Sequence, residues 1–340
     1  MQYRITKKSP LLNNKGELIQ KGWASNLILN YNRNMIKAPA FKIKEWDYYC
    51  ILSSERGAAF TIADNGYLGF VGATIFDFSK PEEISNSIII PFPMGSLRLP
   101  QTSREGDVSY ENKKIKLEFL KKDNLRTLNI FFKNFFNGHD LEGSLTLNQP
   151  KNLETMVIAT PFTKNHHAFY YNQKINCMST EGQLTCGKDK MDFNTDTSFG
   201  VLDWGRGVWT YSNTWYWGSA SGLVNSKSFG FNIGYGFGDT STASENILFY
   251  DGKAHKLDKI KFHIPNDNYL KTWKFSSNDG RLEMNFIPIL DRHSNSDLFI
   301  IKSDQHQVFG RFSGRAILDD GTILEIKDLM GFAEKVKNRW

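Results

Sequence analysis

The stretch "DWGRGVWTYSNTWYW", residues 203–217, concentrates side chains that could bind a small molecule and move a proton. It holds four of the chain's eight tryptophans beside the carboxylate of Asp203 and the guanidinium of Arg206. An aromatic wall with a few convergent polar groups is typical of a small-molecule site. Packing in a hydrophobic core explains the tryptophans equally well, because burying an indole strongly stabilises a fold.

A carboxyl group kept protonated by an aromatic pocket could protonate a double bond and leave a cation that indole faces stabilise. Asp203 is the first candidate for this acid, and Arg206 would orient a polar group of the ligand. The predicted ligand-binding residues are Trp46, Trp204, Arg206, Trp209, Trp215, Trp217, Tyr235 and Asn246.

Glu45 and Asp47 are the next candidate acids. In "FKIKEWDYYCIL", residues 41–52, strict alternation places them on one strand face, about 7 Å apart. If that face points inward, repulsion and burial raise the pKa of at least one carboxyl, which suits a general acid. If it points outward, the two are ordinary surface charges.

The sequence predicts no cofactor and no metal site. The glycines of "GYGFGD", residues 234–239, lack the pattern of a phosphate loop. His166 and His167 are adjacent, so on a strand they would point to opposite faces. A hairpin turn at Glu181–Gly182 would place Cys177 directly opposite Cys186. The two would then be small side chains packed against each other or, as the minority interpretation, a redox or metal-binding pair.

The elements that must position these residues are mostly strands. Alternating runs are separated by turn signals at residues 65–66, 181–182, 251–252, 279–280 and 320–321, a pattern of antiparallel barrels or sandwiches. In residues 228–238 one face is bulky and the other is nearly all glycine, which leaves room for a ligand or for a closely packed element. Only residues 328–340 show a helical stripe, with Asp328 as the N-cap.

Charge and composition narrow the class of protein. The formal net charge is +6, with lysines spread along the chain, so we expect no nucleic-acid partner. Weak attraction to an anionic membrane surface stays open. The first ten residues, "MQYRITKKSP", contain no apolar signal region, and no apolar run is as long as a membrane span. The chain has only three cysteines, so we expect them to be reduced and the protein to be cytoplasmic. The oligomeric state is left open.

Several motifs together resemble a known family. The chain is similar to the bacterial family called domain of unknown function 2804 in the segments "KGWASNLILNYNR", "KIKEWDYY", "GVLDWGRGVWTYSNTWYWGSASG", "SENILFYDGKAHKL", "SNDGRLEMNFIPILDR" and "GRFSGRAILDDGTILEIKDLMGFAEK". More distantly it resembles the two-domain lipocalin-like (calycin) proteins, which include carotenoid hydratases and tocopherol cyclases. The resemblance implies an all-β fold of two lipocalin-like antiparallel barrels, or barrel-like domains, in tandem, with a C-terminal helix. We expect an irregular segment over 1–40, a first domain over 41–203 and a second over 204–340.

Three functions fit these observations. The first is binding of an apolar small molecule, such as a lipid or isoprenoid, in an aromatic pocket near the domain junction. The second is an enzyme of hydratase, cyclase or isomerase type acting on such a ligand. The third is binding or cleavage of an intracellular carbohydrate, because tryptophans stack on sugars and paired carboxylates can cleave a glycosidic bond. The sequence leaves open whether chemistry occurs at all.

Overall fold

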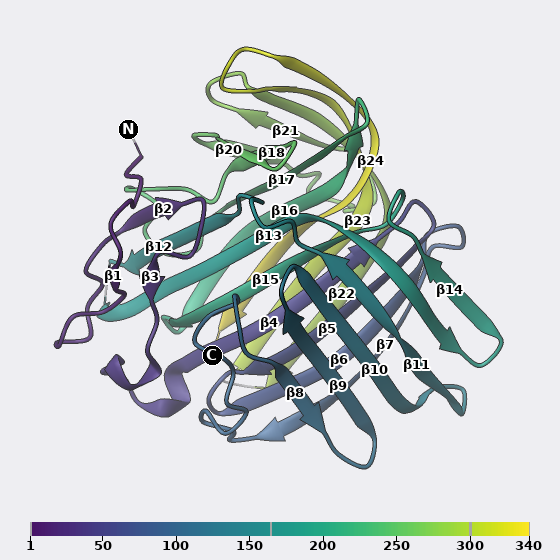
Figure 1. The fold of residues 1–340 in the computed structure, drawn as a ribbon, viewed down its shortest axis with the longest axis horizontal. Helices are drawn as coiled ribbons and strands as arrows, with labels where there is room; N and C mark the ends of the chain where they lie inside the picture. The colour runs from purple at the N-terminus through teal and green to yellow at the C-terminus, as the bar shows by residue number, and fades with distance from the viewer. Residues whose placement is uncertain (1, 164, 299–300, 340) are drawn as a thin grey trace.

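Two antiparallel β-sheets follow one another along the chain in the computed structural model of this protein (Figure 1). The structure describes residues 2–163, 165–298 and 301–339, and it leaves out the side chains of residues 296–301. Both sheets are curled, so the predicted all-β fold of two barrel-like, lipocalin-like units in tandem is confirmed. Among the described residues, no helix is long and apolar enough to cross a membrane.

The first sheet has 13 strands, and its main path runs β7-β6-β5-β4-β15-β13-β11-β10-β9-β8. β12 pairs with β13 and β2, and β14 pairs with β13. The bounds are β2 (Gly22–Ala24), β4 (Ile43–Leu52), β5 (Arg56–Asp64), β6 (Leu68–Asp77), β7 (Glu82–Pro91), β8 (Val108–Glu111), β9 (Ile115–Lys122), β10 (Leu125–Phe136), β11 (His139–Asn148), β12 (Met156–Phe162), β13 (Asn165–Cys186), β14 (Asp189–Phe193) and β15 (Phe199–Val208).

The second sheet has nine strands in the order β19-β18-β17-β16-β24-β23-β22-β21-β20. Its strands are β16 (Ser212–Val224), β17 (Lys227–Tyr235), β18 (Ile247–Tyr250), β19 (Lys253–Lys256), β20 (Ile260–His263), β21 (Trp273–Ser277), β22 (Leu282–Leu298), β23 (Ile301–Ile317) and β24 (Ile323–Arg339). The sheets therefore divide between β15 and β16, and the predicted boundary after residue 203 lies inside β15.

The N-terminal segment has little regular structure. It contains the short parallel pair β1 (Ser9–Pro10) and β3 (Leu29–Asn30) and two 3-10 helices, η1 (Arg33–Met35) and η2 (Ala40–Lys42). Ile5, Leu11 and Tyr31 are nevertheless buried in the core of the first sheet, so this segment completes that core.

The predicted C-terminal helix is wrong. Residues 323–339 form β24, which pairs with β16 on one side and β23 on the other. The apolar residues that suggested a helical stripe are buried from both faces of the strand: Leu329 and Ala333 lie in the core of the second sheet, and Phe332 lies between the sheets. A strand buried on both faces gives a continuous apolar run, which periodicity does not distinguish from a helix.

The predicted hairpin at Glu181–Gly182 is also wrong. These residues lie inside the long strand β13, where Gly182 pairs with Leu145 of β11. Gly182 has φ +129°, and a Cβ atom there would lie 2.2 Å from the backbone oxygen of Ser144, so the glycine permits close strand packing rather than a turn. Cys177 and Cys186 are nine residues apart on one extended strand and do not face each other. All three cysteines are free.

The glycine face of β17 accommodates a neighbouring strand at Gly230. A Cβ atom there would lie 2.6 Å from Sγ of Cys177 on β13. The opposite face carries Phe229, Phe231 and Ile233, all fully buried in the second core. Of the two explanations that the sequence left open, the closely packed element applies at this position.

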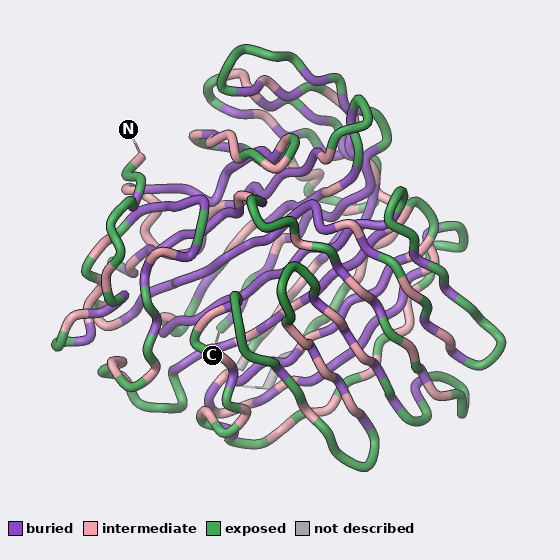
Figure 2. The backbone as a smooth tube through the Cα atoms, in the orientation of Figure 1, coloured by how far each residue is buried: buried purple, intermediate pink, exposed green. Residues whose placement is uncertain are grey.

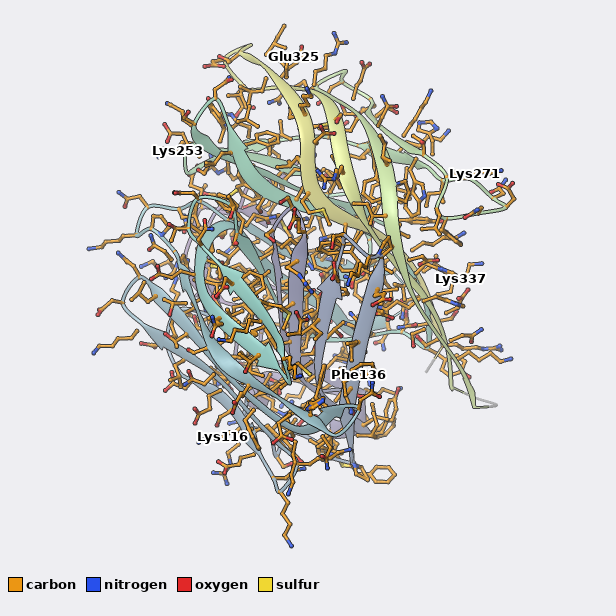
Figure 3. All side chains as sticks on the ribbon, turned by 90° about the vertical axis from the view of Figure 1, so that its right-hand side faces the viewer. Lys116, Phe136, Lys253, Lys271, Glu325 and Lys337 are labelled. Carbon is orange, nitrogen blue, oxygen red and sulfur yellow. The ribbon has the colours of Figure 1, made fainter. Side chains whose placement is uncertain are left out.

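Buried residues run along the middle of the strands of both sheets, and the exposed ones lie mainly on outer loops and strand ends (Figure 2). Most buried apolar residues belong to two cores, one in each sheet. A third apolar cluster joins Cys50, Phe76 and Val201 of the first sheet to Phe309 and Phe332 of the second. Charged side chains such as Lys116, Lys253, Lys271 and Lys337 are spread around the outside (Figure 3). Through the third apolar cluster, the long strands β22, β23 and β24 pack against the first sheet.

Candidate functional site

A cavity of about 380 Å³ lies between the two sheets. Its walls come from β4, β5, β6, β13 and β15 on one side and from β16, β17, β22, β23 and β24 on the other. The aromatic and polar residues that line it include Trp46, Tyr48, Phe70, Tyr170, Lys174, Asp203, Trp209, Trp215, Tyr216, Trp217, Tyr235, Phe237, Glu245, Arg292, Gln307, Glu334 and Asn338. This volume falls in the range of small-molecule sites, roughly 300–1,000 Å³.

One wall of the cavity is a connected set of aromatic rings. Trp46 stacks on Tyr170, with centroids 6.2 Å apart, and meets the edge of Trp209 at 5.2 Å. Trp209 and Trp215 each contact Phe237 edge to face, at 4.8 and 5.3 Å. Interlocked rings of this kind hold one another in place, so the wall is a rigid apolar surface.

Strand alternation selects which residues reach the cavity. On β4, Trp46 and Tyr48 face it, while Glu45 and Asp47 face the other side of the sheet. In the β4–β15 ladder, Asp203 is directly opposite Tyr48 and therefore shares its face.

Asp203 forms an ion pair with Lys174 of β13 at the cavity wall. The Lys174 ammonium lies 2.8 Å from Oδ2 of Asp203, and the Asn172 side chain donates a hydrogen bond of 2.6 Å to Oδ1. The same ammonium lies 3.7 Å from the ring centroid of Trp217. Lys174 and Asp203 are 3% and 8% exposed, so this is a buried, neutralised pair beside an indole face.

Glu334 of β24 is a second buried carboxyl at the cavity. The indole N–H of Trp215 donates to its Oε1 at 2.8 Å, and the amide of Gln307 donates to Oε2 at 3.4 Å. Burial raises the pKa of Glu334 to about 7, and the nearby Asp203 carboxylate acts in the same direction. The Trp215 hydrogen bond and the Lys174 charge oppose this shift only in part.

Glu245 is the third carboxyl at the cavity. Burial raises its pKa, and the Lys174 ammonium acts against that effect. Burial and the neighbouring Glu245 hold the pKa of Tyr170 well above its ordinary value. Three carboxyl groups thus lie near the ammonium of Lys174, and Arg292 acts on Glu334 and Lys256 on Glu245 in the same direction. Burial outweighs these charges at Glu245 and Glu334, which favours retention of a proton by one or more of the carboxyls.

The cavity brings together six of the predicted site residues, namely Asp203, Trp46, Trp209, Trp215, Trp217 and Tyr235. The remaining five, Glu45, Asp47, Trp204, Arg206 and Asn246, do not line it.

Arg206 and Trp204 lie on the face of β15 that points away from the cavity. The fully buried guanidinium contacts Asp47 at 3.0 Å and the backbone oxygen of Pro100 at 2.9 Å, and it stacks over Trp204 at 4.3 Å. Burial raises the pKa of Asp47, and the Arg206 charge counteracts this shift. The group ties β4, β15 and the loop at Pro100 together inside the first core.

Glu45 and Asn246 also have structural partners. Glu45 accepts a 2.7 Å hydrogen bond from Tyr31 and pairs with Arg33, so it anchors the N-terminal segment. Asn246 accepts from the backbone N–H of Gly234 at 2.7 Å and donates to the backbone oxygen of Asp258 at 2.8 Å.

Sequence reasoning missed Lys174, Glu245 and Glu334. Glu334 lies in the "GFAEK" segment, where the expected helix gave it no place near the tryptophans. Lys174 lies on β13, whose length was hidden by the expected turn at Gly182. Correct assignment of β24 and its pairing with β16 would have placed Glu334 opposite Trp217.

The sequence matches the model of one protein family, described as Domain of unknown function (DUF2804), over residues 2–340. The chain belongs to this family. No curated protein matches the sequence.

Among solved structures, the AttH-like protein NE1406 from Nitrosomonas europaea has 12% identity and a TM-score of 0.53, with 90% of this chain and 96% of that one covered. CghA has 9% identity and a TM-score of 0.52, with 98% and 97% covered. Kievitone hydratase from Nectria haematococca has 11% identity and a TM-score of 0.52, with 98% of each chain covered. These likenesses show a shared two-unit β fold, in agreement with the resemblance to the lipocalin-like hydratase group.

Proposed function

We propose that this protein is an acid–base enzyme of hydratase, cyclase or isomerase type, with a small, mainly apolar substrate in the cavity between the sheets. The observation that carries this proposal is Glu334: a buried carboxyl with a pKa raised to about 7, at the edge of an aromatic-lined cavity. A group with this pKa is protonated for a large fraction of the time near neutral pH and can also give its proton up.

In the proposed reaction, the Glu334 carboxyl donates its proton to one carbon of a substrate double bond. The π electrons form the new C–H bond and leave the other carbon cationic, beside the faces of Trp215 and Trp217. In a hydratase, water then adds to that carbon and its proton returns to the Glu334 carboxylate. In an isomerase, a neighbouring carbon loses a proton to the Glu334 carboxylate and a new double bond forms. In a cyclase, a second double bond attacks the cationic carbon, and the new cation then loses a proton to the same carboxylate.

The Lys174–Asp203 pair supports this chemistry without adding net charge. The ammonium of Lys174 lies 3.7 Å from the Trp217 centroid, and its ion pair with Asp203 neutralises its charge. Lys174 and Asp203 are also suited to hold a hydroxyl or carbonyl at the polar end of a substrate. One structural neighbour is a hydratase, kievitone hydratase, which supports the hydratase class.

Binding without turnover, of a lipid or isoprenoid, is the second candidate. The rigid aromatic wall formed by Trp46, Trp209 and Phe237 favours it, because such a surface binds an apolar ligand without help from any acid.

The two functions are separated by one experiment. Protein purified from the organism that encodes it is extracted with organic solvent, and mass spectrometry identifies any stoichiometric compound. That compound and analogues with one double bond are then incubated with the wild type, with Glu334→Gln and with the control Glu325→Gln, which alters an exposed carboxyl on the same strand. Loss of turnover by about 10²–10⁴-fold in Glu334→Gln alone, with binding retained, supports the enzyme. Binding by all three proteins without any product supports the carrier.

A further inference from the structure

The face of β22 and β23 that points away from the cavity carries a compact group of histidines and aspartates. His293 is directly opposite His306 in the ladder, and Asp304 lies two residues before His306 on the same face. Their neighbours Arg292 and Gln307 face the cavity. The hairpin therefore has the cavity wall on one face and this group on the other.

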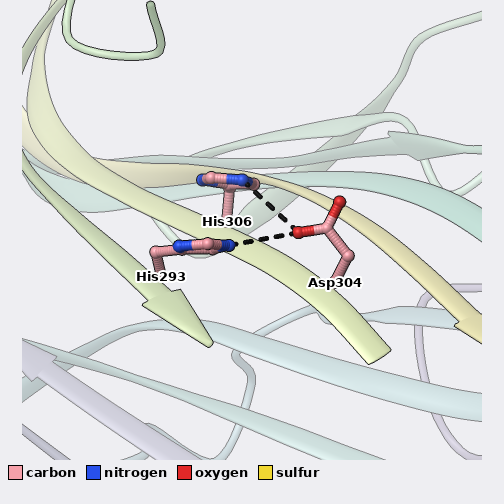
Figure 4. Close-up of side chains that lie close together, drawn as sticks. All are labelled: His293, Asp304 and His306. Atoms are coloured by element: carbon pink, nitrogen blue, oxygen red, sulfur yellow. Dashed lines mark hydrogen bonds and ion pairs between the residues drawn. The ribbon is translucent and has the colours of Figure 1, made fainter. Parts of the chain in front are cut away.

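The three side chains converge on a common point (Figure 4). Nε2 of His293 lies 3.2 Å from Oδ1 of Asp304, and Nε2 of His306 lies 3.5 Å from the same oxygen. One ligand atom from each residue lies within 4.8 Å of the others. Ligands about 2.0–2.1 Å from a tetrahedral zinc ion lie roughly 3.3 Å from one another. The rings of His293 and His306 stack with centroids 4.0 Å apart and planes at 7°, so the exposed His293 ring must turn out of this stack for both Nε2 lone pairs to point at one ion.

His306 is held in the orientation that a metal ligand needs. Its Nδ1 lies 2.8 Å from Oδ2 of Asp291, and Tyr269 stacks on its ring at 4.0 Å. A carboxylate that accepts a hydrogen bond from Nδ1 fixes the tautomer in which the lone pair of Nε2 is available to a metal. The other oxygen of Asp291, Oδ1, is buried and has no hydrogen-bond partner among the described residues. The carboxylate is thus oriented by its contact with His306.

We propose that His293, Asp304 and His306 bind a divalent transition-metal ion of the zinc type, with Asp291 positioning His306. Two imidazoles and one carboxylate form a donor set that such ions favour over Ca²⁺ or Mg²⁺. The two carboxylates balance the charge of the ion. Two lysines of β24 are cations on the same face: Lys335 is opposite His306 and Lys337 is opposite Asp304. The Lys335 ammonium lies 5.7 Å from the Tyr269 ring centroid.

The ion would be structural, because its ligands lie on the face opposite the cavity. It would clamp β22 to β23 along the stretch that also supplies Arg292 and Gln307 to the cavity wall. Sequence reasoning missed this site because the histidines are thirteen residues apart, and only the strand register brings them together.

The test uses the full chain without a histidine tag, stripped with a chelator and titrated calorimetrically with Zn²⁺. Co²⁺ serves as a spectroscopic probe, since imidazole coordination produces visible absorption bands. We expect one Zn²⁺ per chain, and an affinity at least about tenfold lower in His293→Ala, Asp304→Ala and His306→Ala. Asp291→Asn should weaken binding by about 10–100-fold while Co²⁺ bands persist at saturation.

His263→Ala is the matched control, because His263 is an exposed histidine on β20 of the same sheet. It should bind Zn²⁺ as the wild type does. His293 is itself exposed, so its replacement should leave the fold intact, which circular dichroism checks. The proposal is overturned if the wild type shows no saturable binding, or if the folded His293→Ala variant binds with unchanged affinity and unchanged Co²⁺ bands.

Discussion

Replacement of Glu334 by glutamine should change how the stability of the protein depends on pH. The pKa of this carboxyl is raised from 4.5 to about 7 in the folded protein. Between these two values the folded state holds the proton more tightly than the unfolded state does. The free energy of unfolding therefore falls as pH rises through this window. Below pH 4.5 both states are protonated, so the group contributes no pH dependence there.

The size of the effect follows from the shift in pKa. A difference of one pKa unit corresponds to about 1.4 kcal/mol, so the shift of Glu334 amounts to roughly 3 kcal/mol. Glutamine keeps an oxygen that can accept the hydrogen bond from Trp215 but has no proton to lose. The wild type should therefore lose about 3 kcal/mol relative to Glu334→Gln between pH 4.5 and pH 8, as an upper limit.

The assay is equilibrium unfolding in urea at several pH values, for the wild type, Glu334→Gln and the exposed control Glu325→Gln. Tryptophan fluorescence and circular dichroism must give coincident transitions for the free energies to be compared. Only the differences in unfolding free energy between the proteins at each pH are compared, because the contributions of the other titrating groups then cancel. In the native state, the fluorescence of the wild type should also titrate near pH 7, since Glu334 accepts from the Trp215 indole.

A difference between the wild type and Glu334→Gln that stays constant from pH 4.5 to pH 8 would refute the reasoning. So would a wild type that gains stability relative to the variant as pH rises, because a stabilised carboxylate gives that opposite sign.

Three further predictions concern the packing around the site. Lys174→Met should destabilise the protein by about 3–5 kcal/mol, because it leaves Asp203 buried and without its cation; urea unfolding at the wild-type midpoint would contradict this. Gly230→Ala should lower the melting temperature, since the new Cβ would lie 2.6 Å from Sγ of Cys177, and overpacking typically costs about 1–3 kcal/mol; an unchanged melting curve would argue against that contact. Cys50 and Cys177 should react with a thiol reagent at pH 8 only after unfolding, because burial raises the pKa of each to about 12; rapid labelling of the native protein at either residue would show that the site is open.

Local sequence patterns predicted much of the fold. Alternation over residues 41–52 identified β4 and assigned Glu45 and Asp47 to one face. The Asp-Gly pair at 251–252 forms the turn between β18 and β19, with positive φ at both residues. These features depend on contacts between residues close in sequence, which a single sequence carries directly.

The parts that could not be predicted depend on distant pairings. Trp204 and Asp203 are adjacent, so strand alternation sends one into the core and the other to the cavity, and the sequence does not say which. Glu334 reaches the tryptophans only because β24 pairs with β16 across more than a hundred residues. Residues 329–334 of β24 are buried on both faces, which removes the alternation over the stretch that suggested a helix.

The central claim is that the cavity between the sheets holds a small apolar molecule within reach of Glu334. The most direct measurement is a crystal structure of protein purified from the organism that encodes it, with its co-purified or extracted ligand. We predict electron density for one molecule between Trp46 and Trp215, with a carbon atom in contact with the Glu334 carboxyl. A cavity filled by side chains, or a ligand bound elsewhere with the cavity empty, would contradict the claim.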